Sequence, residues 1–312
     1  MKRALLVTIY SFLSSVAYIA LFLLMLFVAD SVYANPVSSG TPMNETRSAK
    51  ANATVRVNNI AGTVKVQGWN KNQVQVTGTL TDGVKLDFHG SGNDLEIRAV
   101  YPENSHNNAE ADLTIQIPVA SRLTVNTVSA DIDSRGLSGS AQLESVSGNV
   151  TLDSHDSDIS AKSVSGEVTV TGSAPGAHVL GRSISGDVRI SDVDGDVQAE
   201  SISGTVKVFQ GRLNRARLSS TSGNVDFSAA LVKSGNYSFN STSGNLSLTF
   251  PKTPDARFDI SSFSGNIDNN FGPKPQRTSE YGPGVELHFV SGHGDAQVNA
   301  RTLSGNITLR VP

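Results

Sequence analysis

The chain has 312 residues, 28 of them glycine, and only 17% are charged; 25 basic residues against 28 acidic ones leave a formal net charge of −3. Without a basic excess to neutralise phosphates, a nucleic-acid-binding protein is not expected. The absence of cysteine excludes disulfides, thiolate zinc sites and a cysteine nucleophile. What is left is the glycine-punctuated, polar composition that is typical of β-rich surface or envelope proteins.

The N-terminus has the order of a secretory signal. Met1-Lys2-Arg3 precede residues 4–29, which carry no charge, and Ser31-Val32-Tyr33-Ala34 then offers a cleavage site. We therefore predict a signal peptide over residues 1–34. An uncleaved signal anchor is the alternative, because residues 4–29 are long enough to span a bilayer and would then be the only membrane contact. Either way the rest of the chain is exported, to the periplasm or the cell surface.

A repeat of the form Ser-x-Ser-Gly-x-Val organises the rest of the chain, as in SVSGEV (163–168) and SISGDV (183–188). Consecutive copies are mostly 18 to 21 residues apart, and the last interval is twice as long. Such regularity is the mark of a repeat architecture. The repeat glycines are Gly148, Gly166, Gly186, Gly204, Gly223, Gly244, Gly265 and Gly305.

Apolar residues alternate with polar ones after each repeat glycine, as in Val188-Arg189-Ile190, which predicts a strand with one buried face. A second alternating set lies seven and five residues before each glycine. The step from that set to the residue two before glycine is odd, so the chain has to bend between them. On this parity we expect these residues to point inward: Val146, Val164, Ile184, Ile202 and Phe263.

A unit of this length cannot bury its own inner face, so copies must stack. We predict an all-β, single-chain parallel β-solenoid (β-helix or β-roll) with coils of about 18–21 residues. An antiparallel sandwich of hairpins is the alternative. Stacking would align the serines one before each glycine, such as Ser165, in a hydroxyl ladder, and would align Asn224, Asn245 and Asn266 in an amide ladder. Glycine at the shared position indicates either a positive φ or a close backbone approach.

Beyond the predicted signal peptide, these patterns divide the chain into two segments. Residues 35–50 are polar, contain two prolines and are expected to form a flexible leader. Residues 51–312 are expected to form one β-solenoid domain, with an irregular β cap and degenerate coils over 51–126 and regular repeats over 127–312. Solenoids need atypical end coils because an exposed sheet edge recruits other chains.

Three motifs together carry a family resemblance: G-x-V-x-V-x-G-W at Gly62–Trp69, L-x-I-x-I-P at Leu113–Pro118, and the iterated S-G-[ND]-[VI]. Their combination resembles the bacterial "putative adhesin" β-strand-repeat family, a domain of unknown function, over nearly all of residues 51–312. The resemblance implies an exported β-solenoid with an adhesin label. It implies no catalytic residues.

Few sequence patterns indicate a catalytic or metal-binding site. A catalytic serine would be singular, whereas these serines recur in every repeat, so we expect no enzyme and no cofactor. Asp192, Asp194 and Asp196 resemble the first half of a calcium loop, but Ser203 stands where the closing Glu should be. Turn formation is the competing role of these aspartates. We expect a non-catalytic binding or structural module of the cell envelope, with an envelope protein or polysaccharide as partner. A periplasmic sensor or accessory domain and a β-helix polysaccharide-active enzyme remain the alternatives.

Overall fold

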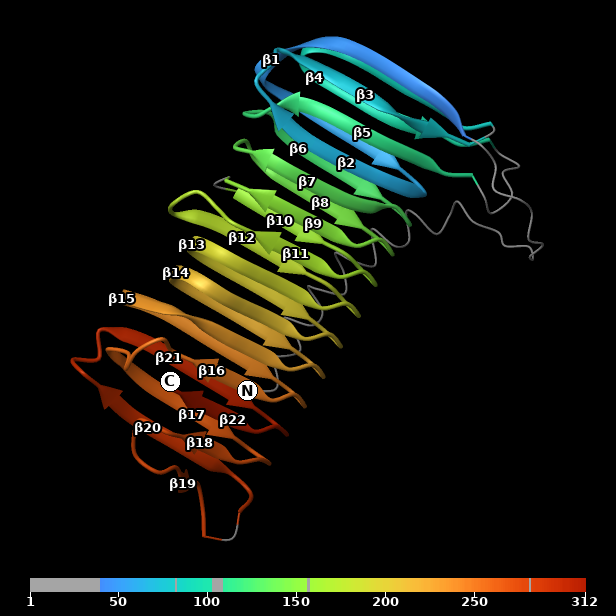
Figure 1. Ribbon diagram of the computed structural model, residues 1–312. Helices are drawn as coiled ribbons and strands as arrows, with labels where there is room; N and C mark the ends of the chain where they lie inside the picture. The colour runs from blue at the N-terminus through green and yellow to red at the C-terminus, as the bar shows by residue number, and fades with distance from the viewer. Residues whose placement is uncertain (1–39, 82, 103–108, 156–157, 281) are drawn as a thin grey trace, which may run out of the picture.

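The computed structural model describes residues 40–81, 83–102, 109–155, 158–280 and 282–312. These residues form strands and turns without a helix, which confirms the all-β prediction. The strands stack into an elongated body (Figure 1). Within the described ranges no helix is long and apolar enough to cross a membrane. The predicted signal peptide or anchor lies outside them.

Each regular repeat contributes one strand before its glycine and one after it, and we call the two resulting rows the pre-glycine row and the post-glycine row. Equivalent strands of neighbouring coils pair in parallel and in register.

In spatial order, the pre-glycine row consists of β4 (Lys85–Val100), β1 (Thr41–Asn59), β6 (Arg122–Thr127), β8 (Ala141–Ser145), β10 (Asp158–Lys162), β12 (Ala177–Arg182), the second parts of β13 (Val188–Ser201), β14 (Val206–Ser220) and β15 (Val225–Ser241), β21 (Ala296–Thr302) and β17 (Ala256–Ser262). The post-glycine row consists of β5 (Ala111–Pro118), β2 (Gly62–Trp69), β7 (Asp131–Leu137), β9 (Val150–Ser154), β11 (Val168–Thr171), the first parts of β13, β14 and β15, β16 (Leu246–Thr249), β22 (Ile307–Arg310) and β18 (Ile267–Asn269).

Antiparallel pairs occur at both ends, so the sheet is mixed. At the N-terminal end, β3 (Gln73–Leu80) runs antiparallel to both β1 and β5. At the C-terminal end, β20 (Val285–Ser291) runs antiparallel to β17 and to the two-residue strand β19 (Gln276–Arg277). The interior of the stack, between these ends, is paired in parallel.

The alternation after each glycine places apolar side chains inside, as predicted. Val188 pairs with Val168 on one side and with Val206 on the other, and all three are fully buried. Arg189, one residue on, faces outward with a half-exposed side chain. The inner faces of the two rows therefore bury one continuous apolar core, which a single repeat could not form.

The corner between the two rows differs from the prediction. Val164 and its equivalents are only half-buried on the corner edge, and Phe263 is 58% exposed. The buried residue is instead the first serine of the motif, such as Ser163. Its oxygen accepts the backbone N–H of Gly166 at 2.9 Å and its hydroxyl donates to the carbonyl of Gly148 at 3.0 Å. The inward alternation therefore continues through Ser163 and the bend follows it, later than the parity predicted, because a polar side chain is needed inside to satisfy the corner backbone.

The predicted hydroxyl ladder is therefore assigned to the wrong serine, two residues after the one that forms it. Ser165, immediately before the glycine, is exposed, whereas the first serine of each motif forms the inter-coil hydrogen bond. The same bond recurs from Ser183, Ser201, Ser220, Ser241 and Ser262, and from Thr302. The asparagine ladder forms in part: the backbone N–H of Asn245 donates to Oδ1 of Asn224 at 3.0 Å, but Asn306 stands between Asn245 and Asn266, and each bond runs from a backbone N–H to a side-chain oxygen.

The repeat glycines are explained by close backbone approach and not by positive φ. None of the eight has a positive φ. A Cβ built on Gly186 would lie 2.1 Å from the carbonyl oxygen of Gly166, and the other repeat glycines show equivalent contacts with the neighbouring coil. A side chain at this position would prevent the coils from stacking at the spacing that their hydrogen bonds require.

The spatial order of the coils departs from the sequence order at both ends. The last repeat, around Gly305, is inserted between the repeats of Gly244 and Gly265, since β21 pairs with both β15 and β17. At the other end, β1 pairs with β6, and β4 lies on its outer side. Both rows of the final repeat thus have partners on each side, which protects the C-terminal strands from fraying.

The predicted leader is partly wrong. Residues 41–50, expected to be flexible, form the first half of β1, and Thr41–Ser48 pair antiparallel with β3. Most side chains of this segment are exposed, so it carries no hydrophobic periodicity that could have revealed it. Backbone hydrogen bonds to β3 supply its order instead. Residues 35–39 lie outside the described residues.

Candidate functional site

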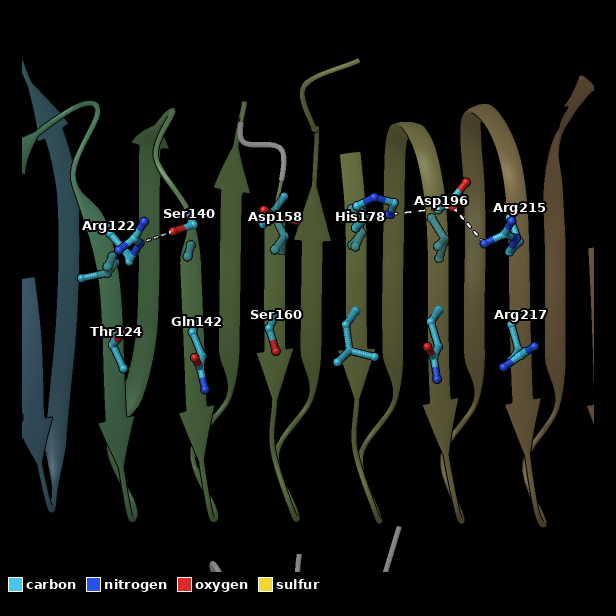
Figure 2. Close-up of a pocket in the computed structure, with 17 residues that line it drawn as sticks. Arg122, Thr124, Ser140, Gln142, Asp158, Ser160, His178, Asp196, Arg215 and Arg217 are labelled. Carbon is cyan, nitrogen blue, oxygen red and sulfur yellow. Dashed lines mark hydrogen bonds and ion pairs between the residues drawn. The ribbon is translucent and has the colours of Figure 1, made fainter. Parts of the chain in front are cut away.

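A long groove lies on the outward side of the pre-glycine row, over β6, β8, β10, β12 and the second parts of β13 and β14 (Figure 2). Its volume is about 500 Å³. Two lines of outward side chains run along it, one per coil and in register. The first line is Arg122, Ser140, Asp158, His178, Asp196 and Arg215, and the second is Thr124, Gln142, Ser160, Leu180, Gln198 and Arg217.

The shape of the groove follows from the core beneath it. Several inward residues under these coils are small, namely Ala161, Gly181 and Ala199, although Leu143 and Leu218 are larger. A Cβ on Gly181 would lie 2.9 Å from Val188 Cγ1, so the two rows approach closely there. In the next coil the inward residues are Tyr237 and Phe239, which need more space between the rows. We infer that small core side chains draw the outer surface inward over these coils.

Beside the groove runs a third line of outward side chains, which we call the ionic wall because its charges cancel in pairs. Lys162 Nζ lies 2.8 Å from Glu144 Oε1, and Arg182 Nε lies 3.2 Å from Glu200 Oε2. The two glutamines of the groove are tied to this wall: Gln142 donates to Glu144 at 3.1 Å and Gln198 donates to Glu200 at 2.6 Å. These contacts fix the glutamine amides before any ligand arrives.

Charges inside the groove are distributed unevenly. Asp196 Oδ2 lies 3.7 Å from His178 Nδ1 and 3.5 Å from Arg215 Nη1 (Figure 2). At the far end, Arg122 Nε donates to the Ser140 hydroxyl at 3.1 Å. Arg217 is exposed and has no hydrogen-bond or ion-pair partner among the described residues. The β14 end of the groove therefore offers a guanidinium that is free to bind an anion.

Sequence reasoning did not find this groove. The acids it singled out were Asp192, Asp194 and Asp196, and only Asp196 lines the groove. The groove residues do follow a countable rule: those of the first line stand eight residues before the repeat glycine and those of the second line six before it, with Ala130 in the place of glycine for Arg122 and Thr124. Aligning the repeats on their glycines and reading these columns would have shown both lines.

The calcium candidates are not gathered into a site. Asp192 lies in a turn with a φ of 58°, the backbone N–H of Asp194 donates to Ser173 Oγ, and Asp196 faces the groove. Within the described ranges no group of three or more His, Asp or Glu residues could hold a metal ion. Asp192 and Asp194 lie within β13, where the chain passes from one row to the other, and Asp196 belongs to the groove.

The match to a family model is extensive. Residues 42–310 match the Toastrack DUF4097 model. The chain belongs to the Toastrack DUF4097 family. The family resemblance drawn from the three sequence motifs is thereby confirmed. No curated protein is significantly similar to this chain.

Solved structures of low similarity include bacterial proteins named for adhesion. A "putative adhesin" from Bacteroides fragilis is 13% identical, with a TM-score of 0.36, over 86% of this Toastrack chain and 97% of its own. A "putative cell adhesion protein" from Clostridium sporogenes is 12% identical, with a TM-score of 0.26, over 87% and 100%.

Proposed function

We propose that this Toastrack protein is a non-catalytic, exported binding module of the bacterial cell envelope, whose ligand lies in the groove of the pre-glycine row. The groove is the observation that supports this proposal. It crosses six successive strands, each about 4.8 Å from the next, so its ligand is an extended molecule of roughly 24 Å or more. The partner is an envelope polysaccharide or protein, and the attachment is made by polar side chains.

The parallel rows support the β-solenoid as the scaffold of this function. A stack of equivalent coils repeats each outward position at a fixed spacing, as the two lines of the groove illustrate. A polymer with its own repeat can contact several coils at once, and many weak contacts then add to a useful avidity. We propose export because residues 4–29 are uncharged, as expected of either a signal peptide or a signal anchor.

The test is a binding assay with a blocked groove. Purified protein is incubated with isolated envelope polysaccharide, and the bound fraction is measured after sedimentation. Ser160 lies half-buried in the second line, and Ser160→Tyr should fill the groove and abolish binding. Thr151→Tyr, on the outward side of the post-glycine row, is the matched control and should bind as the wild type does. Equal binding by both variants would rule out the groove.

A second function is favoured by one observation. Asp158 and Asp196 flank His178 on consecutive coils, so their Cα atoms lie on the order of 10 Å apart. Inverting glycoside hydrolases separate their two carboxyl groups by about 6.5–9.5 Å. Under this alternative the protein would cleave the polysaccharide it binds. Release of reducing ends from a polysaccharide by the wild type, lost in Asp158→Asn, would favour the enzyme over the binding module.

A further inference from the structure

The charges of the groove identify a class of ligand. The ionic wall beside it is neutralised in pairs, and Asp196 already shares its charge between His178 and Arg215. The other acid of the groove, Asp158, lies on β10, three strands away from β14. Arg217 has no partner in the described part of the chain. The positions that pair with Arg215 and Arg217 on the next strand are Asn236 and Ser238, which are uncharged. The β14 end is thus a local cationic site on a chain whose net charge is −3.

The backbone of the groove is not available to a ligand. Strands β8, β10, β12 and the second part of β13 are each paired in parallel on both sides, so their N–H and C=O groups are used within the sheet. A peptide that binds by adding a strand needs a free sheet edge. Recognition here has to use side chains, and those along the second line are largely hydroxyls and amides.

Hydroxyl and amide side chains suit a ligand that is covered with hydroxyl groups. Thr124 and Ser160 can both donate and accept, and the amides of Gln142 and Gln198 are held in place by the wall. Among the described residues no Phe, Tyr or Trp lines the groove, so the charged contact has more weight than ring stacking. Hydrogen bonds to charged groups are stronger than those between neutral groups.

We propose that the groove takes an acidic glycan, a linear polysaccharide bearing uronate carboxylates, one of which is held by Arg215 and Arg217. This inference rests on the function proposed above and names its ligand class. Arg122 lies at the opposite end, about 24 Å away by the spacing of the strands, and binds a second carboxylate of the same chain. Sugar hydroxyls between the two ends contact the hydroxyl and amide side chains.

The experiment compares an acidic glycan with its neutral counterpart. Dissociation constants of the full-length protein are measured for a polygalacturonate oligomer and for the same oligomer as its methyl ester. The wild type should bind the acid about tenfold more tightly, and the preference should weaken in high salt. Arg217→Gln should remove about tenfold from the affinity for the acid and leave the methyl ester unchanged.

Two controls separate this inference from the proposed function. Arg135→Gln changes the net charge equally but lies on the post-glycine row, and it should keep the wild-type affinity. Loss of binding in Arg135→Gln as large as in Arg217→Gln would overturn the proposal, because attraction would then be non-specific. Equal binding of acid and ester, both blocked by Ser160→Tyr, would overturn the acidic class and leave the groove intact. Binding of neither oligomer would also overturn the acidic class, while the envelope assay still tests the groove.

Discussion

The hydroxyl of Ser163 donates to the carbonyl oxygen of Gly148 in the neighbouring coil, across 3.0 Å. The same serine oxygen accepts the N–H of Gly166 within its own coil, at 2.9 Å. One buried side chain therefore pairs with a backbone N–H and a backbone carbonyl at the corner, where the chain belongs to neither row of strands. Since the arrangement recurs in successive repeats, it links the coils along the whole corner.

Ser163→Ala should destabilise the protein by about 1–3 kcal/mol, because it leaves the Gly148 carbonyl and the Gly166 N–H buried without that partner. Ser165→Ala is the control: this serine is exposed, and its loss should change the unfolding free energy by less than about 0.5 kcal/mol. Urea denaturation of the two variants measures the difference. Equal effects would mean that the buried serine does not link the coils.

Gly186→Ala should be far more disruptive than glycine substitutions elsewhere. Its new Cβ would lie 2.1 Å from the Gly166 carbonyl oxygen, so the coils must separate and lose their hydrogen bonds. Gly176→Ala is the comparison, because φ there is +77° but nothing lies within 4 Å. That variant should lose only about 1–2 kcal/mol from backbone strain. Thermal melting that ranks Gly176→Ala as the worse variant would contradict the close-approach explanation.

Val188→Asp should cost several kcal/mol, because it buries a carboxylate between Val168 and Val206 without a partner. Each coil contacts only its neighbours, so limited proteolysis should cut near this coil and leave one part of the stack folded. Arg189→Gln is the outward control and should cost within about 1 kcal/mol. Arg189→Asp is unsuitable, because Glu167 and Asp187 already contact this arginine.

Glu167 should titrate below its ordinary range. Its hydrogen-bonded ion pair with Arg189 lowers the carboxyl pKa, and the hydrogen bond from Thr169 adds to this. Because the pKa of this carboxyl is lower in the folded state than in the unfolded state, the ion pair stabilises the protein at pH values above the unfolded-state pKa. This stabilisation is lost as the pH falls through the folded-state pKa. The pair is largely exposed, so the gain is at most about 1 kcal/mol. NMR titration should show the pKa of Glu167 rising in Arg189→Gln; an unchanged pKa would refute the pairing.

Exported protein should begin at Asn35, because the predicted cleavage follows Ala34. N-terminal sequencing of protein recovered from the periplasm or the surface gives the answer directly. A membrane-bound form that retains Met1 would instead select the signal anchor, with residues 4–29 in the bilayer.

Local patterns in the sequence determined the repeat and its strands. Strict alternation around Val188 requires one buried face, and recurrence of that alternation every 18 to 21 residues requires stacking, because one repeat cannot bury its own apolar side. Glycine at one shared position indicated a tight corner. These inferences depend on neighbouring residues along the chain, so a single sequence is sufficient for them.

Only the tertiary structure decided which contacts close the corner, in what order the coils stack and where a ligand can lie. Parity alone could not show that Ser163 and not Val164 is buried, because that choice depends on a carbonyl contributed by the neighbouring coil. The repeat around Gly305 has the same Ser-Gly-x-[Val/Ile] pattern as its neighbours, so the sequence does not show where it stacks. Its place between the repeats of Gly244 and Gly265 follows from strand pairing at the C-terminal end. The groove likewise joins side chains from six coils, and they line one surface only because the coils stack in register.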